Sequence, residues 1–452
     1  MNALLTLFAL LICALVIFGI PPLVVPFKQD YGTVTVFDAA KAVLLCGAFA
    51  GVGGLLIYLQ DFNRSFLLKL FVAALLIRLM VGATIFAFHG QAFFGGDALT
   101  YDYYGYINLK GWEGESYHKS VADSYIAGGT NPGWGMVYMV SAIYFLVGRN
   151  MLAVQFVAAV LGAATAPLVF LCAHHVFKNL RVARLAAFFV AFYPSLVLWS
   201  SQGLKDGPIV FFLAFSIMAT LKLLDEFNVK HLIGLICAMF CLLSLRFYIF
   251  YMISAAVIGA FIISVQTPSG KRFLQQFIVI IMLGFALTYL GVTRYANLHF
   301  ERFGSLERVQ ASRLDASKSA QSGFARDVDV STTQGAISTV PIGLLYLLLA
   351  PFPWQLVSLR QSITIPEMVV WWGSVPLLLL GLWFSIRYRL RQISPILIFT
   401  VMLSLAYSIF QGNVGTAYRQ RSQLLVFYFI FVAVGYVLVL EKREEKKRRQ
   451  LG

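Results

Sequence analysis

The sequence predicts an all-α polytopic membrane protein. Sixty per cent of its 452 residues are hydrophobic, only 12% are charged, and the mean hydropathy is +0.80, whereas a soluble domain is about 25% charged. A spanning helix needs about 20 apolar residues, and long apolar runs fill most of the chain. These runs are continuous rather than alternating in polarity, which excludes an outer-membrane β-barrel.

The apolar runs give the expected elements in chain order. The runs at 132–148 and 340–354 are short and begin at proline-containing turns, so we expect them to enter the membrane without crossing it. About twelve crossings then remain, with both termini on one side of the membrane. The runs lie at 3–27, 38–60, 66–89, 132–148, 150–177, 182–200, 206–225, 230–246, 247–265, 273–292, 340–354, 366–386, 393–411 and 421–440.

Positive charge gathers at the ends of the runs. Lysine and arginine cluster at 178–184, 271–272, 387–391 and 442–449, and the formal net charge is +15. This is the positive-inside pattern, which orients a membrane protein, so we expect a lipid bilayer and no nucleic acid as partner. With the clusters on the cytoplasmic side, we expect both termini to be cytoplasmic and both long loops to be extracytoplasmic.

We expect the first apolar segment to be a membrane helix and the cysteines to be packing residues. The segment 4–25 has neither a basic leader nor a small-residue cleavage site, so we expect a retained helix rather than a signal peptide. The cysteines lie inside apolar runs, where they are expected to be buried rather than to form disulfides or bind metal. They are Cys13, Cys46, Cys172, Cys237 and Cys241.

Two polar stretches, 90–131 and 293–338, are longer than ordinary connections. The first is rich in glycine, tyrosine and tryptophan and predicts an ordered interfacial loop with short helices. The second predicts an amphipathic helix and a mobile loop. We therefore expect a catalytic transmembrane module over 1–292, the loop 293–338, and a transmembrane region over 339–452 with a basic cytoplasmic tail.

The first candidate for chemistry is Asp97, which follows Gly96 at the mouth of an apolar run. A carboxylate beside a bilayer is costly, and it could take a proton from an acceptor hydroxyl; the alternative role is to cap a juxtamembrane helix. Tyr101 and Asp102 follow. On a helix Asp102 would point away from Asp97, as a structural residue or an acceptor contact. His118, in the same loop, is more typical of a surface residue.

The second candidates are Lys205 and Asp206, at the start of the run 206–225. An acidic residue at a helix N-terminus is a common cap. A lysine in an outer loop is disfavoured by the positive-inside rule, and a phosphate partner would explain Lys205. Arg246 lies between two apolar runs, where its planar charged group suits a phosphate oxygen; the alternative is an arginine that extends to the interface.

Arg419 and Arg421 stand at the predicted outer end of the last apolar run and again depart from the charge rule. In the second loop Arg308 and Arg313 are weaker candidates, because a charge run is usually a solvated face. The chain contains no P-loop, zinc pattern, G-x-S-x-G or Rossmann fingerprint in a plausible context. These absences argue against ATP-driven transport and the common hydrolases.

The order of these features resembles the GT-C glycosyltransferases, in particular the bacterial group related to protein O-mannosyltransferases and aminoarabinose transferases (glycosyltransferase family 39-like). The resemblance covers about residues 70–230. Two departures are that the family's proline pair reads Pro132-Gly133 here and that Tyr418 precedes Arg419. The similar segments are Gly96-Asp97 with Tyr101, Asn131-Pro132-Gly133, Phe192-Tyr193-Pro194 ahead of Lys205-Asp206, and Ala417-Tyr418-Arg419-Gln420-Arg421.

The resemblance implies an inverting transfer of a sugar from a polyprenyl phosphate, undecaprenyl phosphate in a bacterium, to an extracytoplasmic glycan, lipid or protein. Asp97 would be the general base and Asp206 the second acidic position. Cations would stabilise the phosphate leaving group; Lys205, Arg246, Arg419 and Arg421 are the candidates, with Tyr101 and Asp102 beside the substrates. The oligosaccharyltransferase branch needs a divalent ion, but the carboxylates here are scattered, so we expect no cofactor and no essential metal.

Two other functions stay open. An O-antigen polysaccharide polymerase or ligase would also have about twelve helices, and it would use arginines of the second loop, such as Arg308 and Arg313, to bind polyprenyl pyrophosphate. A transporter or lipid flippase would place ionisable residues at mid-helix depth and often shows an internal repeat. The ionisable candidate residues named above are instead expected at one face of the membrane, which favours the transferase.

Overall fold

The computed structural model describes residues 28–29, 32–33, 35–88, 90–94, 96–129, 131–264, 270–289, 292, 296–298, 304–318, 323–324, 328–356 and 358–451. The predicted run 3–27 lies outside the described residues. The chain divides into two compact units: residues 1–167 with 196–208, and residues 168–195 with 209–452. Within the described residues, extended structure is limited to one antiparallel pair, β1 (Lys28–Gln29) with β2 (Gly32–Thr33), and an isolated bridge.

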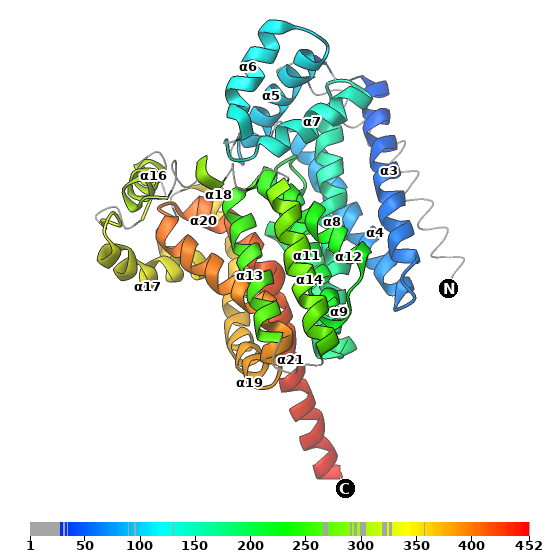
Figure 1. The fold of residues 1–452 in the computed structure, drawn as a ribbon, viewed down its shortest axis with the longest axis vertical. Coiled ribbons are helices and arrows are strands. Elements are labelled where there is room, and N and C mark those ends of the chain that lie inside the picture. Colours follow the sequence, from blue (N-terminus) through cyan, green and yellow to red (C-terminus); the bar gives the residue numbers. More distant parts are fainter. Residues whose placement is uncertain are drawn as a thin grey trace. The chain divides into compact units, whose positions relative to one another are not determined.

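The first unit combines long apolar helices with the short helices of the first loop (Figure 1). Helices α5 and α6 pack against each other, and α5 also packs on α7. The elements are α3 (Val36–Tyr58), α4 (Arg64–Ala87), α5 (Asp97–Trp112), α6 (Ser116–Ile126), η2 (Ala127–Gly129), α7 (Trp134–Val147), α8 (Met151–Phe177) as far as residue 167, α10 (Pro194–Ser200) from residue 196, and the first residues of α11 (Asp206–Asp225).

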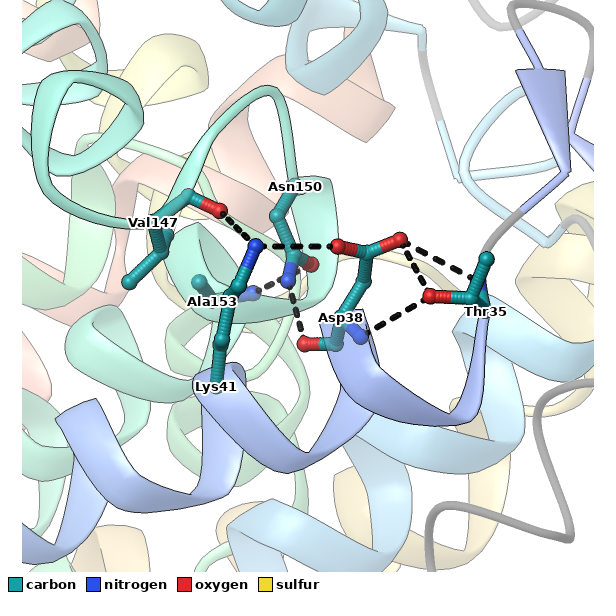
Figure 2. A network of polar contacts seen from close by, with 6 residues as sticks. All are labelled: Thr35, Asp38, Lys41, Val147, Asn150 and Ala153. Carbon is teal, nitrogen blue, oxygen red and sulfur yellow. Dashed lines mark hydrogen bonds and ion pairs between the residues drawn. The ribbon is translucent and has the colours of Figure 1, made fainter.

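Helix α3 is fastened at its start by a capping box. The Thr35 hydroxyl accepts from the Asp38 N–H at 3.1 Å, and the Asp38 carboxylate accepts from the Thr35 N–H at 3.2 Å. Figure 2 shows that the same turn of α3 reaches the connection between α7 and α8, where Lys41 donates to the Val147 carbonyl and Asn150 donates to the Asp38 carbonyl. The α7–α8 connection is therefore held against α3.

The second unit is built around α21, whose apolar part is almost completely buried. A helix that is apolar on all sides suits such a central position. Besides the remainders of α8 and α11, the unit contains α9 (Leu180–Phe192), α12 (Val229–Leu245), α13 (Phe247–Ser264), α14 (Gly270–Tyr289), α16 (Leu306–Lys318), α17 (Thr333–Leu349), η3 (Pro353–Gln355), α18 (Leu359–Ser362), α19 (Ile365–Phe410), α20 (Val414–Gln420) and α21 (Ser422–Leu451).

The predicted class, a polytopic helical membrane protein, is confirmed. Among the described residues seven helices are long and apolar enough to span a membrane, or eight if α9 and α10, bent by 53°, form one broken span. Four shorter apolar helices add to these, including α7 and α17 in the two runs expected not to cross. Those two have 14 and 17 residues, fewer than the roughly 20 that a crossing needs.

Helix α19 contains two of the predicted runs, 366–386 and 393–411. It has 46 residues, but Arg389 between the runs has non-helical backbone angles (φ −137°, ψ 18°). At 1.5 Å per residue its length is roughly 70 Å, about twice the hydrocarbon thickness of a bilayer. The element is therefore two apolar segments that meet at Arg389, as the sequence pattern predicts.

Both polar stretches contain the helices that the sequence predicts. The first loop forms α5 and α6, and the second forms α16. The basic end of α21, from residue 441, is exposed and extends beyond α19 of the same unit (Figure 1).

The prediction that the cysteines are buried is partly wrong. Cys46 and Cys172 are buried and Cys241 is half-buried, but Cys237 is exposed on α12, while Cys13 lies outside the described residues. An exposed position on an apolar helix suits a residue that faces lipid, and the small apolar side chain of cysteine is accepted there as well as in a core. The described cysteines are free thiols.

Glycines let α19 pack closely on α21. A Cβ added at Gly381 would lie 1.8 Å from the Phe431 carbonyl oxygen, whereas one added at Gly373, also on α19, would meet no atom within 4 Å. Small residues at such crossings are the usual means of tight helix packing in membranes.

We predict that Gly381→Ala destabilises the second unit by about 1–3 kcal/mol through overpacking. Gly373→Ala is the matched control, and it should be neutral or stabilising by up to about 1 kcal/mol because alanine favours the helix. Thermal unfolding of the two purified variants in detergent measures the difference. Equal melting temperatures would contradict the close contact between α19 and α21.

Candidate functional site

Asp97 is the first residue of α5 and is half-buried. The residue before it, Gly96, has φ +75°, a left-handed conformation that favours glycine. A carboxylate in the first turn of a helix is stabilised by the unpaired N–H groups and the helix dipole. The Gly-Asp pair therefore starts the helix and places a carboxylate at its N-terminus.

Tyr101, Gly133 and Lys205 meet beside Asp97's helix. Tyr101 lies one turn after Asp97 and thus on the same face of α5. The Lys205 ammonium is 5.8 Å from the centroid of the Tyr101 ring. A Cβ added at Gly133, which has φ +93°, would lie 3.0 Å from Lys205 Nζ and 3.1 Å from the Tyr101 hydroxyl. Tyr101, Gly133 and Lys205, which are far apart in the sequence, thus lie close together in the first unit.

Lys205 belongs to a buried turn between α10 and α11. Its side chain is only 8% exposed and Asp206, the first residue of α11, is 1% exposed. The turn needs a left-handed residue at Gly203 (φ +66°), which packs against Gln155 of α8. A buried ammonium interacts more strongly with an anion than one in water does, so this turn presents a cation suited to a negatively charged group.

Helix α6 supplies one aromatic residue, Tyr125, near Asp97. The rings of Tyr104 and Tyr125 stack with centroids 3.6 Å apart. Burial raises the pKa of the Tyr125 phenol, and the nearby Tyr104 and Asp97 raise it further. Asn131 donates to the Tyr125 carbonyl at 2.7 Å, which fastens α6 to the turn that contains Gly133.

Asp102 is bound by protein groups. It is buried, and its carboxylate accepts from Tyr144 at 2.5 Å and from Arg149 at 2.5 Å. Burial alone would lower the pKa of Arg149, but the hydrogen bond and charge of Asp102 outweigh it and raise the pKa. This geometry favours the structural role over a direct substrate contact.

Arg246 lies in the second unit, in the one-residue connection between α12 and α13. It is 6% exposed, and its guanidinium is 5.7 Å from the Tyr248 ring centroid. The Tyr248 and Tyr407 hydroxyls are 3.3 Å apart, and Tyr407 donates to Gln423 at 2.5 Å. The arginine therefore lies beside a chain of polar groups that runs from the half-buried Tyr248 to the buried Tyr407 and Gln423.

Arg421, also in the second unit, is completely buried and donates to the backbone carbonyls of Leu348 and Ala350. Next to it, Tyr418 donates to Glu367 at 3.0 Å. The contacts of Arg421 therefore hold the end of α17. Arg419, two residues earlier in α20, is half-buried.

The second loop is attached to the turn that precedes Asn413. Arg313 is buried and donates to the Ile409 carbonyl at 3.1 Å. The Phe324 N–H donates to the Gly412 carbonyl at 2.9 Å. Arg308 is exposed on the same helix, α16. The buried arginine of this loop thus has a role in holding the loop.

The predicted site residues divide between the two units. Asp97, Tyr101, Asp102, Lys205 and Asp206 lie in the first, and Arg246, Arg419 and Arg421 lie in the second. Among the described residues no three His, Cys, Asp or Glu side chains gather as a group that could hold a metal.

Two buried ionisable residues were missed. Arg78 on α4 donates to Ser200 at 2.8 Å, and Glu367 on α19 accepts from the Ser195 N–H at 2.8 Å. Both stand inside or at the edge of apolar runs, and a charged residue in such a run is a signal of a polar partner. The signal was present in the sequence.

A comparison with protein families finds a match over residues 133–290 to the family described as dolichyl-phosphate-mannose-protein mannosyltransferase. The match begins at Gly133 and includes Lys205, Asp206 and Arg246; Asp97 precedes it and Arg419 follows it. No curated protein matches the chain. The match confirms the predicted resemblance to the GT-C glycosyltransferases and supports a membrane glycosyltransferase of that type.

We predict that Gly133→Ala lowers the rate of sugar transfer by about tenfold or more, because its Cβ would displace Lys205 and the Tyr101 hydroxyl, and small displacements in an active site are costly. Gly114→Ala is the matched control: Gly114 also has positive φ (+100°), but a Cβ there meets no atom within 4 Å. Transfer assays on both purified variants test this. Equal loss in both would assign the effect to backbone strain alone.

Proposed function

We propose that this protein transfers a sugar from a polyprenyl-phosphate donor to an extracytoplasmic acceptor, with inversion at the anomeric carbon and with Asp97 as general base. The observation that supports it best is that Gly133 and Lys205 lie close to Tyr101, which belongs to the helix that begins with Asp97. The reaction needs a carboxylate that takes the proton of the attacking hydroxyl and a cation that stabilises the departing phosphate.

Asp97 would act on the acceptor. Its carboxylate is half-buried at a helix N-terminus, where a hydroxyl group can still reach it. The acceptor oxygen forms a bond to the anomeric carbon, the bond from that carbon to the phosphate oxygen breaks, and the hydroxyl proton passes to Asp97. The products are the glycosylated acceptor and the polyprenyl phosphate.

Lys205 would bind the leaving phosphate. Its buried position strengthens its attraction to the negative charge that develops on the phosphate oxygen. Arg246 and Arg419 belong to the second unit and stay candidates for phosphate binding from the sequence alone. Arg421 is better suited to holding α17, because it donates to backbone carbonyls. Asp206, the buried first residue of α11, is proposed as the second acidic position, and no metal ion is needed in this scheme.

The setting is proposed to be a bacterial inner membrane. Both termini would lie in the cytoplasm, consistent with the exposed basic end of α21. The first loop, with α5 and α6, would then face the outside, where lipid-linked sugars and cell-surface acceptors meet. The acceptor is a glycan, a lipid or a protein.

We predict that Asp97→Asn abolishes transfer, with a loss of about 100-fold or more, because the variant lacks a general base. The assay is product formation by protein in nanodiscs, with a panel of radiolabelled undecaprenyl-phosphate sugars and a membrane glycan extract. Asp123→Asn is the matched control, because Asp123 is an exposed acid of the same loop, and it should keep wild-type activity.

Three outcomes would contradict the proposal. Transfer that survives Asp97→Asn would move the chemistry elsewhere. Loss of activity only on substitution of Arg308 or Arg313 would favour the polysaccharide polymerase or ligase. Movement of a lipid-linked sugar across the membrane without a covalent product would favour the flippase.

A further inference from the structure

Asp102 and Arg149 form a two-point contact between the first loop and the start of α8. Arg149 Nη2 is 2.5 Å from Asp102 Oδ2 and its Nε is 3.3 Å from Oδ1, while Tyr144 donates to Oδ1 at 2.5 Å. The guanidinium also lies 4.5 Å from the centroid of the Tyr106 ring, one turn along α5. A two-point arginine–carboxylate contact fixes orientation as well as distance.

Arg149, which binds Asp102, lies in a segment that is also attached to α3. Arg149 lies in the α7–α8 connection, whose neighbouring residues contact α3 (Figure 2). Lys41 is 3.4 Å from the Val147 carbonyl, and Asn150 donates to the Asp38 carbonyl at 2.6 Å. The side chain of Asn150 also accepts from the Ala153 N–H at 3.3 Å, which caps α8. The connection is therefore a fixed point of the first unit.

Contacts close to the Asp102–Arg149 pair fix the position of α5 along α7. A Cβ added at Gly105 would lie 2.3 Å from Val140 Cγ1, so glycine is needed for the two helices to approach. Ser141 of α7 donates to the Gly105 carbonyl at 2.9 Å and accepts from Asn108 at 2.9 Å. Apolar contacts alone would allow α5 to slide or rotate, whereas these polar contacts exist at only one register.

We propose that Asp102 and Arg149 are positioning residues, which set the rotation and depth of α5 and thereby place Asp97 and Tyr101 against Lys205. The proposal rests on the proposed role of Asp97. Asp102 is the residue after Tyr101, so a shift of the carboxylate moves the Tyr101 contact with Lys205 directly. Neither Asp102 nor Arg149 touches the reacting atoms in this account.

The decisive variant is Asp102→Glu, which keeps the ion pair but lengthens the carboxylate arm by one methylene. We expect kcat to fall about tenfold or more, because transfer depends on the placement of Asp97. KM for donor and acceptor should change less than kcat does, and the melting temperature should stay near that of the wild type. Asp123→Asn, the exposed acid of the same loop, is the control.

A double-mutant cycle tests the pair itself. Asp102→Asn with Arg149→Gln should be no slower than the slower single variant, since each single change removes the same interaction. A wild-type kcat in Asp102→Glu, additive effects in the cycle, or a loss of kcat that matches the loss of folded protein would overturn the positioning role.

Hydrogen–deuterium exchange separates this proposal from the proposed function, because it needs no activity. In nanodiscs, Asp102→Asn should speed exchange over α5 by about tenfold while Asp123→Asn leaves it unchanged. Unchanged exchange in Asp102→Asn would overturn the proposal whether or not a substrate is known. A wild type that transfers no sugar from any donor, with faster exchange in Asp102→Asn, would contradict the proposed function and leave the anchoring of α5 supported.

Discussion

A charge that is removed from water is stable only where another group offsets it, and this constraint decides where the ionisable residues of the described chain lie. Asp102 is paired with Arg149 and Tyr144. Arg421 is bound by two backbone carbonyls. Each of these contacts joins segments that are distant in the sequence, so the charges that the membrane makes costly also fix the helices relative to one another within each unit.

Asp97 differs from these residues because it keeps part of its surface exposed. Its carboxylate lies in the first turn of α5, where the helix dipole favours a negatively charged group. Lys205 is complementary: its ammonium is buried against Tyr101 and Gly133, where an anionic group would be bound more strongly than in water. The same constraint thus accounts both for the residues that hold the site and for those that are proposed to act in it.

The sequence predicts the helices well because their signal is local. A run such as 421–440 needs no partner to be recognised, and the two runs inside α19 are visible although the chain forms one long element. Lys205 and Asp97 were also found locally, since a charge at the edge of an apolar run is unusual. The class of the protein and its resemblance to the GT-C enzymes followed from such features, and the match over 133–290 confirms that resemblance.

Pairings between distant segments could not be predicted in this way. Nothing in the local sequence indicates that Asp102 binds Arg149, 47 positions later in the chain, or that Tyr125 of α6 stacks on Tyr104. For Arg421 the sequence showed an unusual charge but not its partners, because a buried arginine can bind backbone carbonyls as well as a phosphate. Glu367 and Arg78 are a different case, since their positions in apolar runs were a signal that the interpretation did not use.

The most direct test of the central claim, that Asp97 and Lys205 serve one reaction centre, is an experimental structure in nanodiscs with a bound polyprenyl phosphate. We expect the phosphate within hydrogen-bonding distance of Lys205 Nζ, about 3 Å, with Tyr101 and Asp97 facing the same bound molecule. A phosphate bound by Arg308 and Arg313 of the second loop, with Lys205 distant from it, would contradict the account.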